Sequence, residues 1–123
     1  MPKLRNSTDR LLNDLKETKY DLQMFGQLGN AFQDTNAAVT PPSGKVIVAI
    51  SMLADTTFTA MSAENIEGSK SFGLTGGETG TGSGGVVITA TNKFPKGITI
   101  YGRWTSVTPA ADNDGGIICY FGL

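Results

Sequence analysis

An alternating pattern near the C-terminus restricts this chain to a fold built on β-strands. Within Gly97–Val107, side chains two positions apart share a face of an extended strand. One face carries Ile98, Ile100, Gly102 and Trp104, and the other carries Thr99, Tyr101, Arg103 and Thr105. A turn-rich loop over 109–116 separates this stretch from a second apolar run, Ile117–Phe121. The pattern predicts two neighbouring strands.

Further apolar runs predict additional strands upstream. Lys45–Met52 is nearly continuous in apolar residues, and Thr56–Met61 and Val86–Ala90 are shorter candidates. The glycine-rich segment 76–85 predicts an exposed loop. We therefore predict a mainly β fold, a small antiparallel β-sandwich or barrel. The residues expected to hold its core are Trp104, Ile100, Phe58, Ile118 and Tyr120.

The N-terminal part of the chain has a different period, which predicts a three-part organisation. Residues 1–28 form an amphipathic α-helical arm, 29–44 a linker, and 45–123 the β domain. Apolar positions in the arm are alternately four and three apart, namely Leu4, Thr8, Leu11, Leu15, Thr18, Leu22 and Phe25. This stripe either packs on the chain's own domain, or forms a short coiled coil or docks on a partner. In the second case Leu11, Leu15, Leu22 and Phe25 make the partner contacts.

Composition argues against several classes of function. The chain has no histidine, the commonest metal ligand and proton carrier, and its single cysteine, Cys119, cannot form an internal disulfide. Because Cys119 lies in an apolar strand, we expect its thiol to have a raised pKa. The net charge of −1, with mixed signs in the arm, predicts no binding to nucleic acid. No apolar run reaches the length of a membrane span or a signal sequence, so we expect no membrane association and synthesis in the cytoplasm.

The segments that resemble catalytic or ligand motifs are all incomplete. The glycine-rich loop lacks the Gly-Lys-Ser/Thr ending of a phosphate-binding loop. Asp112 and Asp114 resemble part of a calcium loop, but the position of the bidentate glutamate is occupied by Leu123. Glu64 and Glu67 are expected to be solvated. We therefore predict no catalytic residue, no cofactor and no metal site.

Tyr101 and Arg103 are the candidate surface contacts. An exposed aromatic residue beside an arginine is able to bind a sugar or a protein partner. We also expect Arg103 to pair with an acid across a subunit boundary, while Trp104 lies on the opposite face in the core.

Three segments of the β domain resemble small virion structural proteins of tailed bacteriophages, of the marine and cyanophage type. They are Val48–Ile50 with Asp55–Thr59, then Pro95–Ser106, which contains Gly-Arg-Trp-Thr-Ser, and then Gly116–Gly122. Relatives of this kind are non-enzymatic β domains on the virion surface, such as capsid decoration or cement proteins, head fibres and tail appendages. The arm resembles no such protein.

The resemblance implies a capsid decoration protein, located on the virion after synthesis in the host cytoplasm. We expect a homo-oligomer, a trimer, that binds the major capsid protein or another virion protein. An alternative hypothesis is a tail or head-fibre adhesin that binds a host surface glycan through Tyr101, Arg103 or the 76–85 loop. A third is an enzyme that uses carboxylates, which the missing motifs disfavour.

Overall fold

The computed structural model describes residues 28–66, 70–74, 79–111 and 115–123. All but the last residue of the predicted arm lie outside these ranges, as do Leu11, Leu15, Leu22 and Phe25. The arm's helix and its contacts therefore stay predictions.

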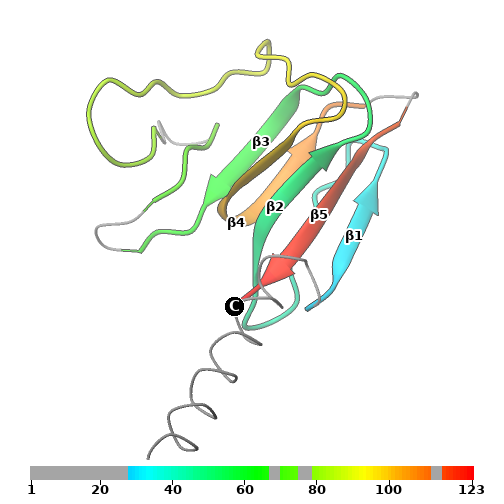
Figure 1. Cartoon of the computed structure of the whole chain (residues 1–123), viewed down its shortest axis with the longest axis horizontal. Helices are drawn as coiled ribbons and strands as arrows, with labels where there is room; N and C mark the ends of the chain where they lie inside the picture. The colour runs from blue at the N-terminus through cyan, green and yellow to red at the C-terminus, as the bar shows by residue number, and fades with distance from the viewer. Residues whose placement is uncertain (1–27, 67–69, 75–78, 112–114) are drawn as a thin grey trace, which may run out of the picture.

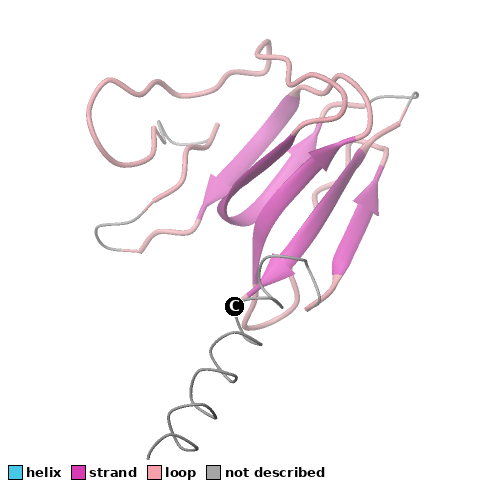
Figure 2. Ribbon diagram, in the orientation of Figure 1, coloured by secondary structure: helices cyan, strands magenta, loops and turns pink. Residues whose placement is uncertain are grey.

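The described residues form one five-stranded antiparallel sheet (Figures 1 and 2). Its strands are β1 (Asn30–Gln33), β2 (Val46–Met52), β3 (Phe58–Ala63), β4 (Thr99–Pro109) and β5 (Ile117–Gly122). The spatial order is β1-β5-β2-β4-β3, so β2 lies at the centre between the two C-terminal strands. The mainly β prediction is confirmed, and the sandwich or barrel stays a prediction because only one sheet is described.

The strand predictions succeeded where the pattern was strong and failed at two weaker segments. Strands β2, β3, β4 and β5 are confirmed within a few residues of their expected bounds. The predicted linker contains strand β1, which pairs with β5. Val86–Ala90 was wrongly predicted as a strand; it lies in the long β3–β4 connection, where Val86 is 79% exposed.

One face of the sheet, here called the core face, carries most of the buried side chains. The fully buried ones of large volume include Trp104, Phe58, Ile47, Ile50, Met52, Met61, Ile117 and Val107. In β5 the core residues are Ile117, Cys119 and Phe121, which pair with core residues of β2. Ile118 and Tyr120, predicted to hold the core, point to the opposite face and are half-buried. That prediction was wrong because an uninterrupted apolar run does not reveal which alternate set faces inward.

The two long connections contribute side chains to the core. The β1–β2 connection contributes Val39, which is hydrogen-bonded in both directions to Val107 on β4. The β3–β4 connection contributes Phe72 near its start and Phe94 near its end. Phe94 packs edge-on against Phe58, with ring centroids 5.4 Å apart. Between these points the connection extends beyond β3, away from the rest of the sheet (Figure 1).

Trp104 organises the core beside the start of the long connection. Its indole nitrogen donates a 2.8 Å hydrogen bond to the Phe72 carbonyl, and the two rings meet edge to face at 5.7 Å. The indole also lies across Gly102, where an added Cβ would be 2.7 Å from two of its ring carbons. Real Cβ atoms do not approach so closely, so glycine at 102 is required for the indole to pack there.

Candidate interaction surface

The second face of the sheet, here called the open face, consists of two rows of side chains across four strands. Directly opposed residues in antiparallel strands point to the same side, so the register defines the rows. The first row is Asn30, Tyr120, Ala49 and Tyr101, and the second is Phe32, Ile118, Ser51 and Thr99. Each row runs from β1 through β5 and β2 to β4.

This face exposes more aromatic surface than a solvated sheet face requires. Tyr101 is 69% exposed and Phe32 is 58% exposed, at opposite ends of the two rows. Between them Ile118 and Tyr120 are half-buried, and Ala49 is buried in the row that contains both tyrosines. An apolar patch of this kind is a common mark of a contact surface.

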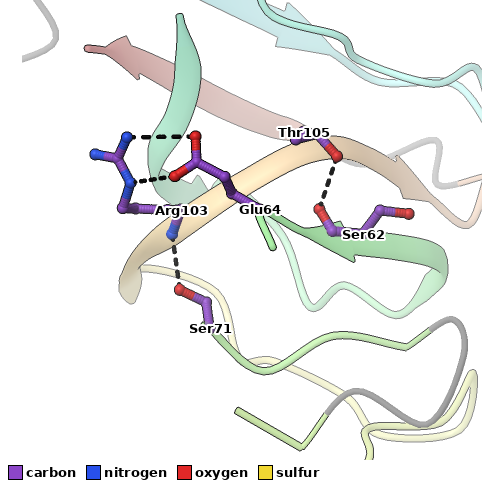
Figure 3. A network of polar contacts seen from close by, with 5 residues as sticks. All are labelled: Ser62, Glu64, Ser71, Arg103 and Thr105. Atoms are coloured by element: carbon purple, nitrogen blue, oxygen red, sulfur yellow. Dashed lines mark hydrogen bonds and ion pairs between the residues drawn. The ribbon is translucent and has the colours of Figure 1, made fainter. Parts of the chain in front are cut away.

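The polar groups on the open face are largely satisfied within it. The hydroxyls of Ser51 and Thr99, neighbours in the second row, are hydrogen-bonded to each other at 2.8 Å. Arg103, two residues beyond Tyr101 on β4, forms an ion pair with Glu64, with Nε 2.7 Å from Oε1. A second contact joins Nη2 to Oε2 at 3.4 Å (Figure 3). A partner would therefore meet little unpaired charge here.

The Arg103–Glu64 pair corrects two predictions. The acid that pairs with Arg103 comes from the same chain, where a subunit boundary was expected, and Glu64 is ion-paired although it was expected to be solvated. Both side chains are partly shielded from water, with exposed fractions of 35% for Arg103 and 21% for Glu64. The pair fixes the start of the long connection against β4.

Backbone contacts at Arg103 explain why Glu64 is held in place. Strand β3 ends at Ala63, and the main chain of Arg103 then bonds to the segment that follows. Its carbonyl accepts from the Glu64 N–H at 2.9 Å, and its N–H donates to the Ser71 hydroxyl at 2.8 Å. Farther along β4, the Thr105 hydroxyl donates to the Ser62 carbonyl (Figure 3).

The point where the described chain begins lies beside the open face. Lys45 Nζ donates a 2.9 Å hydrogen bond to the Leu28 carbonyl, and the Phe121 N–H donates to the Gly29 carbonyl. Strand β1 starts at the next residue, Asn30, and places Asn30 and Phe32 on the open face. The preceding 27 residues therefore connect to the edge strand of this surface.

The structure brings together one predicted pair and adds residues that the sequence analysis missed. Tyr101 and Arg103 share the open face, as their spacing indicated. Phe32, Ile118 and Tyr120 were not predicted as surface contacts, because Phe32 was placed in a linker and the other two in the core. The alternation of Asn30–Gln33 is too short to have identified the missing strand.

Cys119 has the one resolved pKa shift among the described residues. Burial on the core face raises the pKa of its thiol from the ordinary value of 9.0 to about 12. A thiol in this state is protonated and shielded at neutral pH, as predicted, and is a poor nucleophile.

Within residues 28–66, 70–74, 79–111 and 115–123, no cluster of three or more His, Cys, Asp or Glu side chains is placed to hold a metal ion. In that same part of the chain, no helix has the length and apolar character needed to cross a membrane.

Comparison of the chain with protein-family models, with curated proteins and with solved structures finds no match in any of the three.

Proposed function

We propose that this chain is a structural protein of a phage virion, a decoration or cement protein that binds the capsid surface as an oligomer and stabilises it. The observation that supports this proposal best is the open face. It combines exposed aromatic residues with hydroxyls and charges that already have partners inside the chain. Such a surface loses little when it is covered by another protein and gains from the burial of its aromatic area.

The position of the resembling segments is compatible with this proposal. Gly116–Gly122 contains β5, Val48–Ile50 lies in β2, and Pro95–Ser106 contains much of β4. These three adjacent strands carry most of the open face as well as the core. The resemblance therefore concerns the residues that build the surface.

In the proposed mechanism, the missing layer of the fold comes from assembly. A single sheet with one covered face has a modest core for its length, and burying the second face between copies or against the capsid adds a second layer. Many copies bound at once would turn weak individual contacts into durable reinforcement.

Co-sedimentation with empty phage heads tests the proposal. The full-length chain is expected to sediment with heads and to raise the temperature at which the heads fall apart. A variant with Phe32→Asp and Tyr101→Asp should bind at least about tenfold more weakly, and Val86→Asp, on the exposed connection, should bind normally. Absence of binding by the full-length chain would contradict the proposed function.

Exposed Tyr101 also supports a second candidate function, an appendage adhesin that binds a host surface glycan. A glycan array separates the two functions. Specific binding that is lost in Tyr101→Ala, together with no binding to heads, would replace decoration with adhesion.

A further inference from the structure

We infer that the open face binds the N-terminal arm of a second copy of this chain, so that neighbouring copies exchange arms around a ring. This inference rests on the proposed function, because it specifies how the oligomer in that proposal is formed. The surface is the two rows defined above, and the occupant is the apolar stripe of residues 4–25.

The open face and the stripe of the arm are both largely apolar. The open face presents Phe32, Ile118, Tyr120 and Tyr101, while Arg103 is neutralised by Glu64 at its border. The stripe is leucine-rich and ends with Phe25, and the charged residues between positions 9 and 21 fall outside it. An apolar helix face on an apolar sheet face is the usual way in which both are removed from water.

The length of the preceding segment also fits. Strands of six or seven residues extend about 20 Å, whereas a helix over 4–25 would be about 33 Å long. The stripe is therefore longer than the face that it would cover, and roughly a third of it is left for another partner such as the capsid. The described chain begins at Leu28, directly before the edge strand β1, so the arm leaves the sheet at its border.

The size of the open face favours an arrangement in which each copy makes two contacts. Four strands at about 4.8 Å spacing and at most about 20 Å length cover no more than roughly 400 Å². One contact on this face, whether with a second sheet or with an arm, would bury roughly 800 Å² in total, which is below the range of about 1,200–2,000 Å² for stable specific interfaces. In arm exchange each copy buries its face at one contact and its arm at another, so every copy is held twice.

Exchange between different surfaces also gives a closed ring. The arm of one copy and the face of the next are different patches. A contact of this kind forms a ring when the rotation that relates successive copies adds up to a full turn. Docking of the arm on its own sheet would instead cover both patches within one copy, leaving no contact for the oligomer that the proposed function requires.

Complementation between two full-length variants tests the exchange. The arm variant carries Leu15→Asp and Leu22→Asp, and the face variant carries Phe32→Asp and Tyr101→Asp. Because Phe32 and Tyr101 are exposed, the face variant should keep the near-ultraviolet circular dichroism of buried Trp104. Val86→Asp is the matched control, since it places the same charge at an exposed apolar residue outside the surface.

Sedimentation velocity should show an oligomer for the wild-type chain and for Val86→Asp. Each of the other variants alone should be monomeric, with association weakened at least about tenfold. An equimolar mixture of the two should form a heterodimer, because it combines one intact arm with one intact face.

Three results would each overturn the exchange. They are a monomeric wild-type chain, which indicates docking of each arm on its own sheet; an arm variant that associates like wild type, which indicates contact between sheets; and a mixture that stays monomeric, which indicates that the arm does not bind the open face. Binding to phage heads is measured separately. A ring that does not bind heads supports the exchange and refutes the proposed function, whereas head binding without complementation does the reverse.

Discussion

The core face and the open face are formed by the same strands and even by adjacent residues, yet they meet different surroundings. Trp104 on the core face is fully buried under the long connection, whereas Tyr101, three residues earlier on β4, is 69% exposed. In β5, Cys119 is buried while its neighbours Ile118 and Tyr120 are half-buried. Hydrophobicity alone therefore does not determine which face becomes the core. The connections determine which face becomes the core, because Val39, Phe72 and Phe94 from these connections all pack against the same side of the sheet.

Replacement of an aromatic residue on each face gives the widest contrast. Trp104→Ala should lower the free energy of unfolding by about 3–5 kcal/mol, because it removes the largest core side chain and leaves a cavity. Tyr101→Ala should change it by no more than about 0.5 kcal/mol in the monomer. Urea unfolding in dilute solution measures both. Similar losses for the two variants would show that the faces are equivalent.

Gly102→Ala tests how closely the indole packs on the sheet. The new Cβ would clash with Trp104 and with the Ser71 hydroxyl, and overpacking of this kind costs about 1–3 kcal/mol. Gly44→Ala is the control, since it has a φ of +81° but no atom within 4 Å, so it should cost about 1 kcal/mol through backbone strain alone. Urea unfolding measures the loss in the free energy of unfolding. In a Trp104→Leu background Gly102→Ala should cause a smaller loss, and an unchanged loss would show that the new Cβ does not clash with the indole.

Alkaline pH should reveal the burial of Cys119. Its folded-state pKa of about 12 lies above the value of 9.0 for an ordinary thiol, so above pH 9 the unfolded chain releases a proton that the folded chain keeps. The resulting stability is complete below pH 9 and is lost progressively between pH 9 and 12. From pH 8 to pH 10 the thiol should account for a loss of about 1.4 kcal/mol.

Cys119→Ala provides the control for this pH dependence, because other groups also titrate in the same range. The variant should be less stable at pH 8, but its free energy of unfolding should fall less steeply toward pH 10. Parallel pH profiles for the two proteins would mean that the thiol is accessible to solvent in the folded state.

A double-mutant cycle at the border of the open face should give the smallest effect. Arg103→Met and Glu64→Gln each break the ion pair, and the coupling energy should be about 0.5–1 kcal/mol, since both groups remain partly exposed. Added salt should reduce it. A coupling near zero would show that the backbone bonds to Glu64 and Ser71 hold the connection without help from the charges.

The sequence predicted the fold where alternation was long or an apolar run was bounded by turns. Strand β4 alternates over its first half, and this placed Trp104 inside and Tyr101 outside correctly. For β5 the prediction of which alternate residues face the core was wrong, because every residue from Ile117 to Phe121 is apolar and both alternate sets are suited to a core. Val86–Ala90 has a strand-like composition, but no strand of the sheet pairs with it.

The candidate surface was harder to predict because it depends on pairing between distant segments. Phe32 joins Ile118 only through the β1–β5 register, and nothing in Asn30–Gln33 alone indicates a strand. Glu64 reaches Arg103 across 39 positions of sequence. Local pattern predicts which residues share a face of one strand, but it does not predict which strands are neighbours.

Hydroxyl-radical footprinting of the full-length chain at increasing concentration tests most directly whether the second face is an interaction surface. Oxidation of Phe32 and Tyr101 should be strong in dilute solution and should fall as the chain associates, while Trp104 stays protected throughout. Equal oxidation of Phe32 and Tyr101 at every concentration, under conditions where the chain is shown to associate, would contradict the account.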